Sequence, residues 1–346
     1  MTIRVGVVGL GMGRHHAKVY AASPLARLVA ICDVDEKRLA EYQALYPQAR
    51  AYTSYEELFA SGQVDAVSVA LPNYLHDTVA IAALEAGVHV LCEKPMAVSA
   101  PRAQAMLDAA RAAGKKLMIH FNYRYQPASQ YLKRYVDEGH LGELYYARTR
   151  WLRARGVPKP GGWFGIKELS GGGPVIDLGV HRLDLALWLM GYPKAISVSA
   201  SAFDLVGRRF AQEMGVRYDV EDLATALIRL DNGVTLQMEA SWVGGTDLRE
   251  DMLTAIYGVN GAAIHRNMNE GYDFEALALQ ESDGTLVQIS PKRYGAPCPS
   301  AVDDFLRCID DDCELEAKPE HGLELMRIID AIYLSSAQGR EVRLDD

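Results

Sequence analysis

Short apolar segments alternate with helix-like segments through the first third of the chain. The apolar segments are rich in β-branched residues and cover residues 3–9, 26–32, 64–71, 88–92 and 116–121. They are almost continuously apolar, as strands covered on both faces must be. The intervening segments 73–86 and 99–114 carry apolar residues at helical spacing. Because parallel strands need crossover connections, this alternation predicts a doubly wound parallel sheet.

The pattern changes after about residue 122. Strand-like runs then follow at 143–153, 195–203, 223–230, 233–243 and 252–258. The turn "DNG" at 231–233 is typical of a hairpin, so we expect a largely antiparallel second sheet, with two late helices at 300–310 and 321–337. A chain of 346 residues exceeds the usual size of one hydrophobic core. We therefore predict two domains, residues 1–121 and 122–346.

Composition excludes several classes of partner. The net charge of -9 argues against nucleic acid and anionic membrane surfaces. No apolar run approaches the roughly 20 residues that a membrane helix needs, and the N-terminus lacks a signal-peptide pattern. The five cysteines show no CxxC and no metal-finger spacing. They are therefore expected to be reduced thiols in a cytoplasmic protein.

A glycine-rich turn follows the first predicted strand. In "VVGLGMGRHHA", Gly9, Gly11 and Gly13 separate that strand from a helix, which suits a bound pyrophosphate. The third glycine comes one residue earlier than in GxGxxG, and a plain tight turn is the alternative. Asp33 ends the second strand, where an acid would bind the adenosine ribose and repel a 2′-phosphate by at most about 4 kcal/mol. NAD is therefore preferred, while nearby Arg38 keeps NADP possible.

The stretch "VHVLCEKPMA" ends a buried strand on charged residues. Lys94 lies between Glu93 and Pro95, at the edge of the sheet where doubly wound folds bind ligands. The alternative is a solvated strand end with a salt bridge. The neighbouring segment "LPNYLH" places Asn73 and His76 beside the expected cofactor, or else as a helix cap and a surface histidine.

The segment "LSGGGPVIDLGVHRLDLALWLMG" predicts a helix that starts near Pro174. An apolar stripe runs along it, and a polar stripe of Asp177, His181 and Asp184 lies beside the apolar one. This polar stripe is either a solvated helix face or the edge of a cleft. Carboxylate and imidazole four residues apart can also share a cation, but no third ligand stands out, so no metal is predicted.

Residues 71–97 and 171–184 together resemble the GFO/IDH/MocA family of oxidoreductases, and the resemblance extends over nearly the whole chain. It implies a Rossmann domain that carries NAD(P), followed by an α/β domain with a large, open, mostly antiparallel sheet. Family members often form dimers or tetramers through that sheet. The resemblance also suggests a cis bond before Pro95 and places Lys94, Asp177 and His181 around the nicotinamide. The expected cofactor contacts are Gly9, Gly11, Met12, Gly13, Asp33, Leu71, Pro72, Asn73, His76, Glu93 and Lys94.

The resemblance predicts oxidation of a secondary alcohol on a sugar, polyol or glycoside. His181 would take the proton, Lys94 would stabilise charge on the reacting oxygen and Asp177 would orient substrate or imidazole, although the lysine and histidine roles could be exchanged. Two alternatives remain: a glycoside-cleaving enzyme that uses tightly bound NAD for transient oxidation, and a cofactor-sensing binding protein. The remaining substrate candidates are Tyr123, Arg124, Arg153 and, in the glycine-rich segment 159–173, Trp163.

Overall fold

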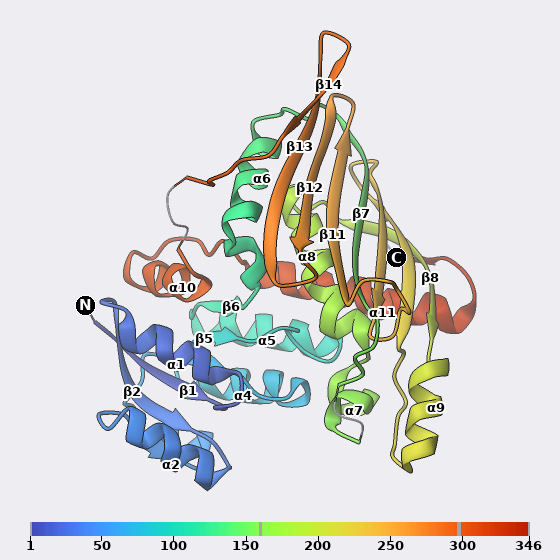
Figure 1. Ribbon diagram of the computed structural model, residues 1–346. Coiled ribbons are helices and arrows are strands. Elements are labelled where there is room, and N and C mark those ends of the chain that lie inside the picture. The colour runs from blue at the N-terminus through green and yellow to red at the C-terminus, as the bar shows by residue number, and fades with distance from the viewer. Residues whose placement is uncertain (1, 159–160, 296–298, 345–346) are drawn as a thin grey trace. The chain divides into compact units, whose positions relative to one another are not determined.

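The computed structural model describes residues 2–158, 161–295 and 299–344 (Figure 1). The chain forms two compact units. The first contains Met1–Phe121 and Pro299–Met326, and the second contains Asn122–Cys298 and Arg327–Asp346. The two units meet in sequence at the junction after residue 121, but the later segment 299–326 belongs to the first unit rather than to one continuous second domain. Lys159 and Pro160 of the glycine-rich segment lie outside the described residues.

The first unit is built on a six-stranded parallel sheet, which confirms the predicted doubly wound class. The strand order is β3-β2-β1-β4-β5-β6. Since the order reverses between β1 and β4, the carboxyl ends of these strands form the switch point at which such sheets bind ligands. The strands are β1 (Ile3–Val8), β2 (Ala26–Cys32), β3 (Arg50–Tyr52), β4 (Ala66–Val69), β5 (His89–Cys92) and β6 (Leu117–Ile119).

Helices connect these strands, as crossovers in a parallel sheet must (Figure 1, dark blue to cyan). Ser99 precedes α5, Pro101 lies in its first turn and Gly114 ends it with a left-handed φ of 60°. The late helix α10 begins with a capping box between Ser300 and Asp303. The helices are α1 (Gly13–Ala22), α2 (Glu36–Leu45), α3 (Tyr55–Ala60), α4 (His76–Glu85), α5 (Ala100–Ala113), α10 (Ala301–Asp310) and the first turns of α11 (Pro319–Gln338).

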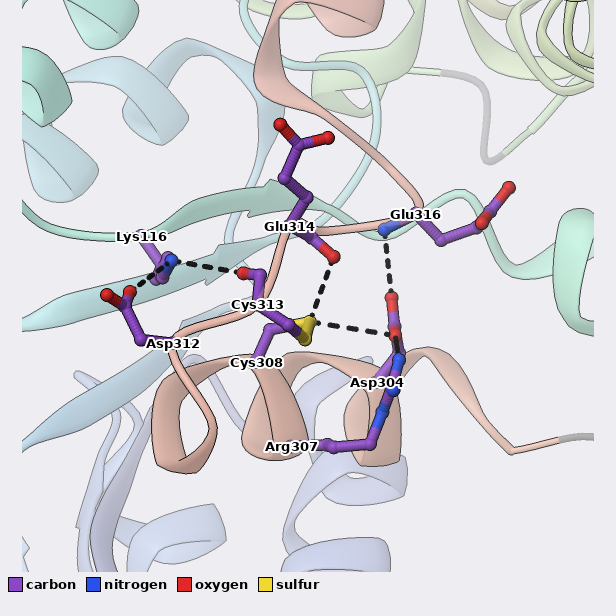
Figure 2. The surroundings of a disulfide bond; sticks show 8 residues. All are labelled: Lys116, Asp304, Arg307, Cys308, Asp312, Cys313, Glu314 and Glu316. Atoms are coloured by element: carbon purple, nitrogen blue, oxygen red, sulfur yellow. Dashed lines mark hydrogen bonds and ion pairs between the residues drawn. A yellow bond between two sulfur atoms is a disulfide. The ribbon is translucent and has the colours of Figure 1, made fainter.

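A disulfide joins Cys308 of α10 to Cys313 in the loop that follows (Figure 2). The expectation of reduced thiols is therefore wrong for these two residues; two cysteines five positions apart lack the CxxC spacing that would have suggested a pair. Lys116 anchors the same loop through Asp312 (2.8 Å) and the carbonyl oxygen of Cys313 (3.0 Å). Cys32 and Cys92 are free and buried.

The second unit contains a nine-stranded sheet in the order β14-β13-β12-β11-β7-β10-β9-β8-β15. Only β7 and β10 pair in parallel among these described strands, so the mostly antiparallel sheet is confirmed. The "DNG" turn joins β9 to β10, with Gly233 at a φ of 85°. The strands are β7 (Leu144–Arg153), β8 (Ala195–Phe203), β9 (Leu223–Leu230), β10 (Thr235–Ser241), β11 (Glu250–Gly258), β12 (Gly261–Met268), β13 (Asp273–Ser282), β14 (Thr285–Ile289) and β15 (Val342–Arg343).

Helices α6 and α8 cover one face of this sheet (Figure 1). Alternate residues of β9, from Ala224 to Leu230, are buried on one side, while Leu227 on the other side remains exposed. The helices here are α6 (Pro127–Asp137), α7 (Lys167–Ser170), α8 (Val180–Leu189), α9 (Leu205–Met214) and the rest of α11. Among the described residues, no helix combines the length and the apolar character that crossing a membrane would require.

Candidate active site

The glycine turn between β1 and α1 has the shape that a pyrophosphate needs. Gly9 has a φ of 90°, and a side chain there would overlap the carbonyl oxygen of Ala70. A Cβ at Gly13 would lie 2.7 Å from a methyl group of Val7, so this glycine permits close packing of α1 on the sheet. A Cβ at Gly11 would meet nothing within 4 Å, which leaves the backbone open to a ligand at the N-terminus of α1. The early third glycine therefore still serves helix packing, and the residues fit a dinucleotide.

Asp33 supports this turn directly. Its carboxylate is buried and accepts the backbone N–H of Leu10 at 2.7 Å. Arg38 donates to the same carboxylate at 3.1 Å and also lies 3.2 Å from Asp35. The charge of Arg38 is thus already engaged by two acids, which leaves Asp33 as the acidic group at the end of β2. This arrangement favours ribose hydroxyls over a 2′-phosphate.

Two histidines surround Glu93 at the end of β5. His16 Nε2 and His120 Nδ1 lie 2.9 Å and 3.0 Å from the same carboxylate oxygen, and Ser68 Oγ lies 2.9 Å from the other nitrogen of His16. Burial alone would raise the pKa of Glu93, but the two histidines hold it well below its usual value. The three donor atoms lie within 4.8 Å of one another, as in some metal sites. Both contacts to Glu93 have hydrogen-bond lengths, however, and one proton between each histidine nitrogen and the carboxylate oxygen is enough to explain them. The expectation of no metal stays a prediction.

Glu93 also fixes the loop that carries Lys94. Its second carboxylate oxygen accepts the backbone N–H of Lys94 at 3.3 Å. The peptide bond between Lys94 and Pro95 is cis, as the resemblance suggested. His76 is fully buried, and its ring nitrogens face the carbonyl oxygens of Pro95 (2.7 Å) and Leu71 (2.8 Å). Because both ring nitrogens are engaged, His76 ties the two loops together, and we do not propose it as a cofactor contact.

The helix that carries Asp177 and His181 begins with a π-helical segment, Val175–Gly179, and continues as α8. Such segments occur often at functional sites. A side chain at Gly179 would overlap Met238, so this glycine lets the helix lie directly on β10. Asp177 accepts a hydrogen bond from the indole of Trp242 at 3.1 Å. The predicted polar stripe therefore includes an acid that a fully buried tryptophan holds in place.

Aromatic rings surround His181. The ring of Tyr123 meets the imidazole edge to face at 5.0 Å, and that of Trp151 lies 5.7 Å away. Both aromatic residues belong to a buried cluster that also includes Trp242. Both rings are only 4% exposed, so they pack around the imidazole and keep water away from it. The second unit thus combines an acid, an imidazole and an apolar wall.

The other substrate candidates have partners of their own. Arg153 donates to Glu250 at 3.0 Å, and Trp163 stacks on Phe164 at 3.9 Å. Arg124 is fully buried and forms an ion pair with Asp184 of α8. This pair explains the acid at the end of the polar stripe and gives Arg124 a structural role, so we do not propose a substrate contact for it.

Sequence reasoning missed Glu221, a buried acid in the loop before β9. Its two carboxylate oxygens accept the backbone N–H groups of Gly173 (2.9 Å) and Val175 (3.0 Å), and the hydroxyl of Tyr333 (3.1 Å). Burial raises the pKa of Glu221, and these hydrogen bonds oppose the rise. The segment "YDVED" contains three acids, and no local pattern marks Glu221 among them as the partner of a helix that starts near residue 174.

The fold and the glycine turn define a dinucleotide-binding oxidoreductase, and comparison with known proteins gives its family. The profile of an oxidoreductase family with an NAD-binding Rossmann fold matches residues 3–121, and that of the GFO/IDH/MocA C-terminal domain matches residues 129–264. D-glucoside 3-dehydrogenase from Escherichia coli (strain K12) is 32% identical over 99% of this chain and 97% of its own length. The chain belongs to the GFO/IDH/MocA family of oxidoreductases.

Two further relatives match over the full length. Inositol 2-dehydrogenase from Rhizobium meliloti (strain 1021) is 25% identical, with 99% of this chain and 100% of that protein covered. A structure of levoglucosan dehydrogenase in complex with NADH has a TM-score of 0.88 at 25% identity and covers 100% of both chains. These matches agree with the glycine turn and Asp33: the chain is an NAD(P)-dependent oxidoreductase.

Proposed function

We propose that this protein oxidises a secondary hydroxyl group of a sugar, polyol or glycoside with NAD as the preferred acceptor. The observation that carries the proposal is the NAD-type glycine turn with Asp33 in the first unit. The second unit, taken by itself, adds Asp177 and His181 on one helix beside aromatic rings. The similarity to D-glucoside 3-dehydrogenase and inositol 2-dehydrogenase supports a carbohydrate or cyclitol substrate. NADP remains the second possible cofactor.

The reaction must remove a hydride from carbon and a proton from oxygen. Bound NAD supplies the hydride acceptor. We propose that His181 takes the proton, since imidazole titrates near neutral pH, and that Lys94 donates a hydrogen bond to the reacting oxygen. Asp177, held by Trp242, would orient the substrate or the imidazole. Tyr123, Arg153 and Trp163 remain proposed substrate contacts, and the glycine turn, Leu71, Pro72, Asn73 and Glu93 remain proposed cofactor contacts.

The test is NADH formation across a panel of glucosides, inositols, aldoses and uronates. Lys94→Ala should lower turnover by about 10²- to 10⁴-fold while NAD still binds. Lys115→Ala is the matched control, because Lys115 follows α5 and precedes β6, at the opposite edge of the parallel sheet. Near-normal turnover in Lys94→Ala would rule out the proposed role of this lysine.

The same panel separates the alternatives. Release of sugar from a glycoside without net NADH would indicate cleavage by transient oxidation, and NAD binding with no turnover would indicate a sensor. The similarity to several dehydrogenases favours net oxidation over both.

We also propose that the protein forms a homodimer or homotetramer through the second sheet. The face of β9 and β10 opposite the buried side carries partly exposed residues, including Leu227 at 38% exposure. Leu227→Glu should lower the mass measured by light scattering, whereas Leu45→Glu, at an exposed leucine of α2 in the first unit, should not. We also propose that the protein lies in the cytoplasm, because Cys32 and Cys92 are free thiols.

A further inference from the structure

The helix with Asp177 and His181 starts without a side-chain cap of its own. Pro174 occupies the cap position and forms no side-chain hydrogen bond there. The first N–H groups of a helix have no partners within it, so a buried helix start needs acceptors from elsewhere. Glu221 provides them: its oxygens bind the N–H groups on either side of Pro174, at Gly173 and Val175.

Two of the three consecutive glycines, Gly172 and Gly173, are explained by the same contacts. A side chain at Gly172 would overlap the hydroxyl of Tyr333, and one at Gly173 would overlap the backbone of Glu221. Tyr333 in turn donates to Glu221 at 3.1 Å. Glycine is therefore required here because an acid and a tyrosine approach the backbone closely.

Two hydrogen-bond chains lead from Glu221 to the proposed catalytic residues. Gly173, held by Glu221, accepts the backbone N–H of Asp177 at 3.1 Å. Val175, also held by Glu221, accepts the backbone N–H of Val180, which directly precedes His181. The backbone positions of Asp177 and of Val180, the residue before His181, thus each depend on one carboxylate oxygen of Glu221.

We propose that Glu221, supported by Tyr333, is the positioning residue for Asp177 and His181. No lysine or arginine in the described part of the chain forms an ion pair with Glu221, so three neutral donors alone compensate its burial. A buried carboxylate without a counter-charge is costly, whereas apolar residues would fill the same space at lower cost. Its contribution is therefore the geometry of the helix start. This inference rests on the proposed function and adds to it a residue that does not touch the substrate.

The test compares Glu221→Gln with Asp222→Asn. Asp222 is the adjacent buried acid, and it accepts the N–H groups of Val206 and Gly207 at the start of α9, which carries no proposed catalytic residue. With the best sugar of the panel and NAD, Glu221→Gln should lower kcat by about 10- to 100-fold and leave the KM for NAD within about twofold. Asp222→Asn should leave kcat near that of the wild type.

Hydrogen exchange gives a second readout that does not depend on activity. Glu221→Gln should speed exchange in peptides that cover residues 173–189, and Asp222→Asn should do so in peptides that cover 205–214. Unchanged kcat and unchanged exchange in Glu221→Gln, or an equal loss of kcat in Asp222→Asn, would overturn the proposal. If Glu221→Gln does not fold, Tyr333→Phe takes its place with the same two criteria. If the wild type oxidises no sugar, the proposed function fails, and the exchange comparison still decides the role of Glu221.

Discussion

The buried ion pair between Arg124 and Asp184 should dominate the stability of the second unit. Both side chains are at most 1% exposed, and Arg124 Nε lies 2.9 Å and 3.2 Å from the two oxygens of Asp184. Burial alone would lower the pKa of Arg124, but the charge of Asp184 raises it, so the pair is ionised. Asp184→Asn keeps the shape and removes the negative charge that faces the buried guanidinium. Breaking such a pair costs about 3–5 kcal/mol.

Tryptophan fluorescence measures this loss in the right part of the molecule. All four tryptophans, Trp151, Trp163, Trp188 and Trp242, belong to the second unit. Urea unfolding followed by their emission should therefore report the free energy of unfolding of that unit. The matched control is Glu213→Gln, which removes the acid of an exposed pair with Arg209 (3.8 Å) and should change the free energy by less than about 1 kcal/mol.

A double variant separates charge from packing. Arg124→Met combined with Asp184→Leu removes both charges, and apolar side chains need no counter-ion, so much of the loss should be recovered. Recovery will be incomplete because the hydroxyl of Tyr192 loses its acceptor on Asp184. A loss below about 1 kcal/mol in Asp184→Asn would refute the reasoning, since it would mean that the buried guanidinium does not depend on this carboxylate.

Two further predictions concern the first unit. Asp33→Ser should lower the preference for NAD over NADP by about 10-fold or more, because it removes the carboxylate that repels a 2′-phosphate and that takes up part of the charge of Arg38. Asp35→Asn removes only the second partner of Arg38 and should change the preference less. An unmoved ratio of kcat/KM values in Asp33→Ser would contradict our interpretation of Asp33. Burial lowers the pKa of His89 to about 4, below 6.5, so the unfolded chain binds more protons between these values and stability falls as the pH drops through this window. Thermal unfolding followed by circular dichroism should show a weaker pH dependence in His89→Gln, and an identical dependence would contradict this account.

Much of the fold follows from local patterns. Strands covered on both faces are continuously apolar, so β1, β2, β4, β5 and even the three-residue β6 were predictable. β3 is equally short but begins with the exposed Arg50, so it forms no apolar run. Helices were predicted at 300–310 and 321–337 within a second domain, whereas the structure places residues 299–326 in the first unit. Helical spacing shows that one face is buried, but it does not show which of two cores buries that face.

The site was predictable to the extent that its residues lie in short motifs. The glycine turn, the loop with Lys94 and the helix with Asp177 and His181 each lie in one stretch of sequence, and each is recognisable there. Their partners come from distant positions: His16 and His120 reach Glu93, Asp184 pairs with Arg124, and Glu221 reaches Gly173. Such pairs depend on tertiary structure, and no spacing rule reports them.

These distant partners compensate the buried acids in different ways. Two histidines surround Glu93, and its pKa falls well below the usual value. Glu221 has only neutral donors, and its pKa rises. As the pH falls, Glu221 should therefore take up a proton before Glu93 does. Glu221 supports the start of the helix with Asp177 and His181. Glu93 supports the loop with Lys94. The two family motifs, the loop with Lys94 and the helix with Asp177 and His181, are thus held by carboxylates that differ in pKa. Acid should disturb the helix before it disturbs the loop with Lys94.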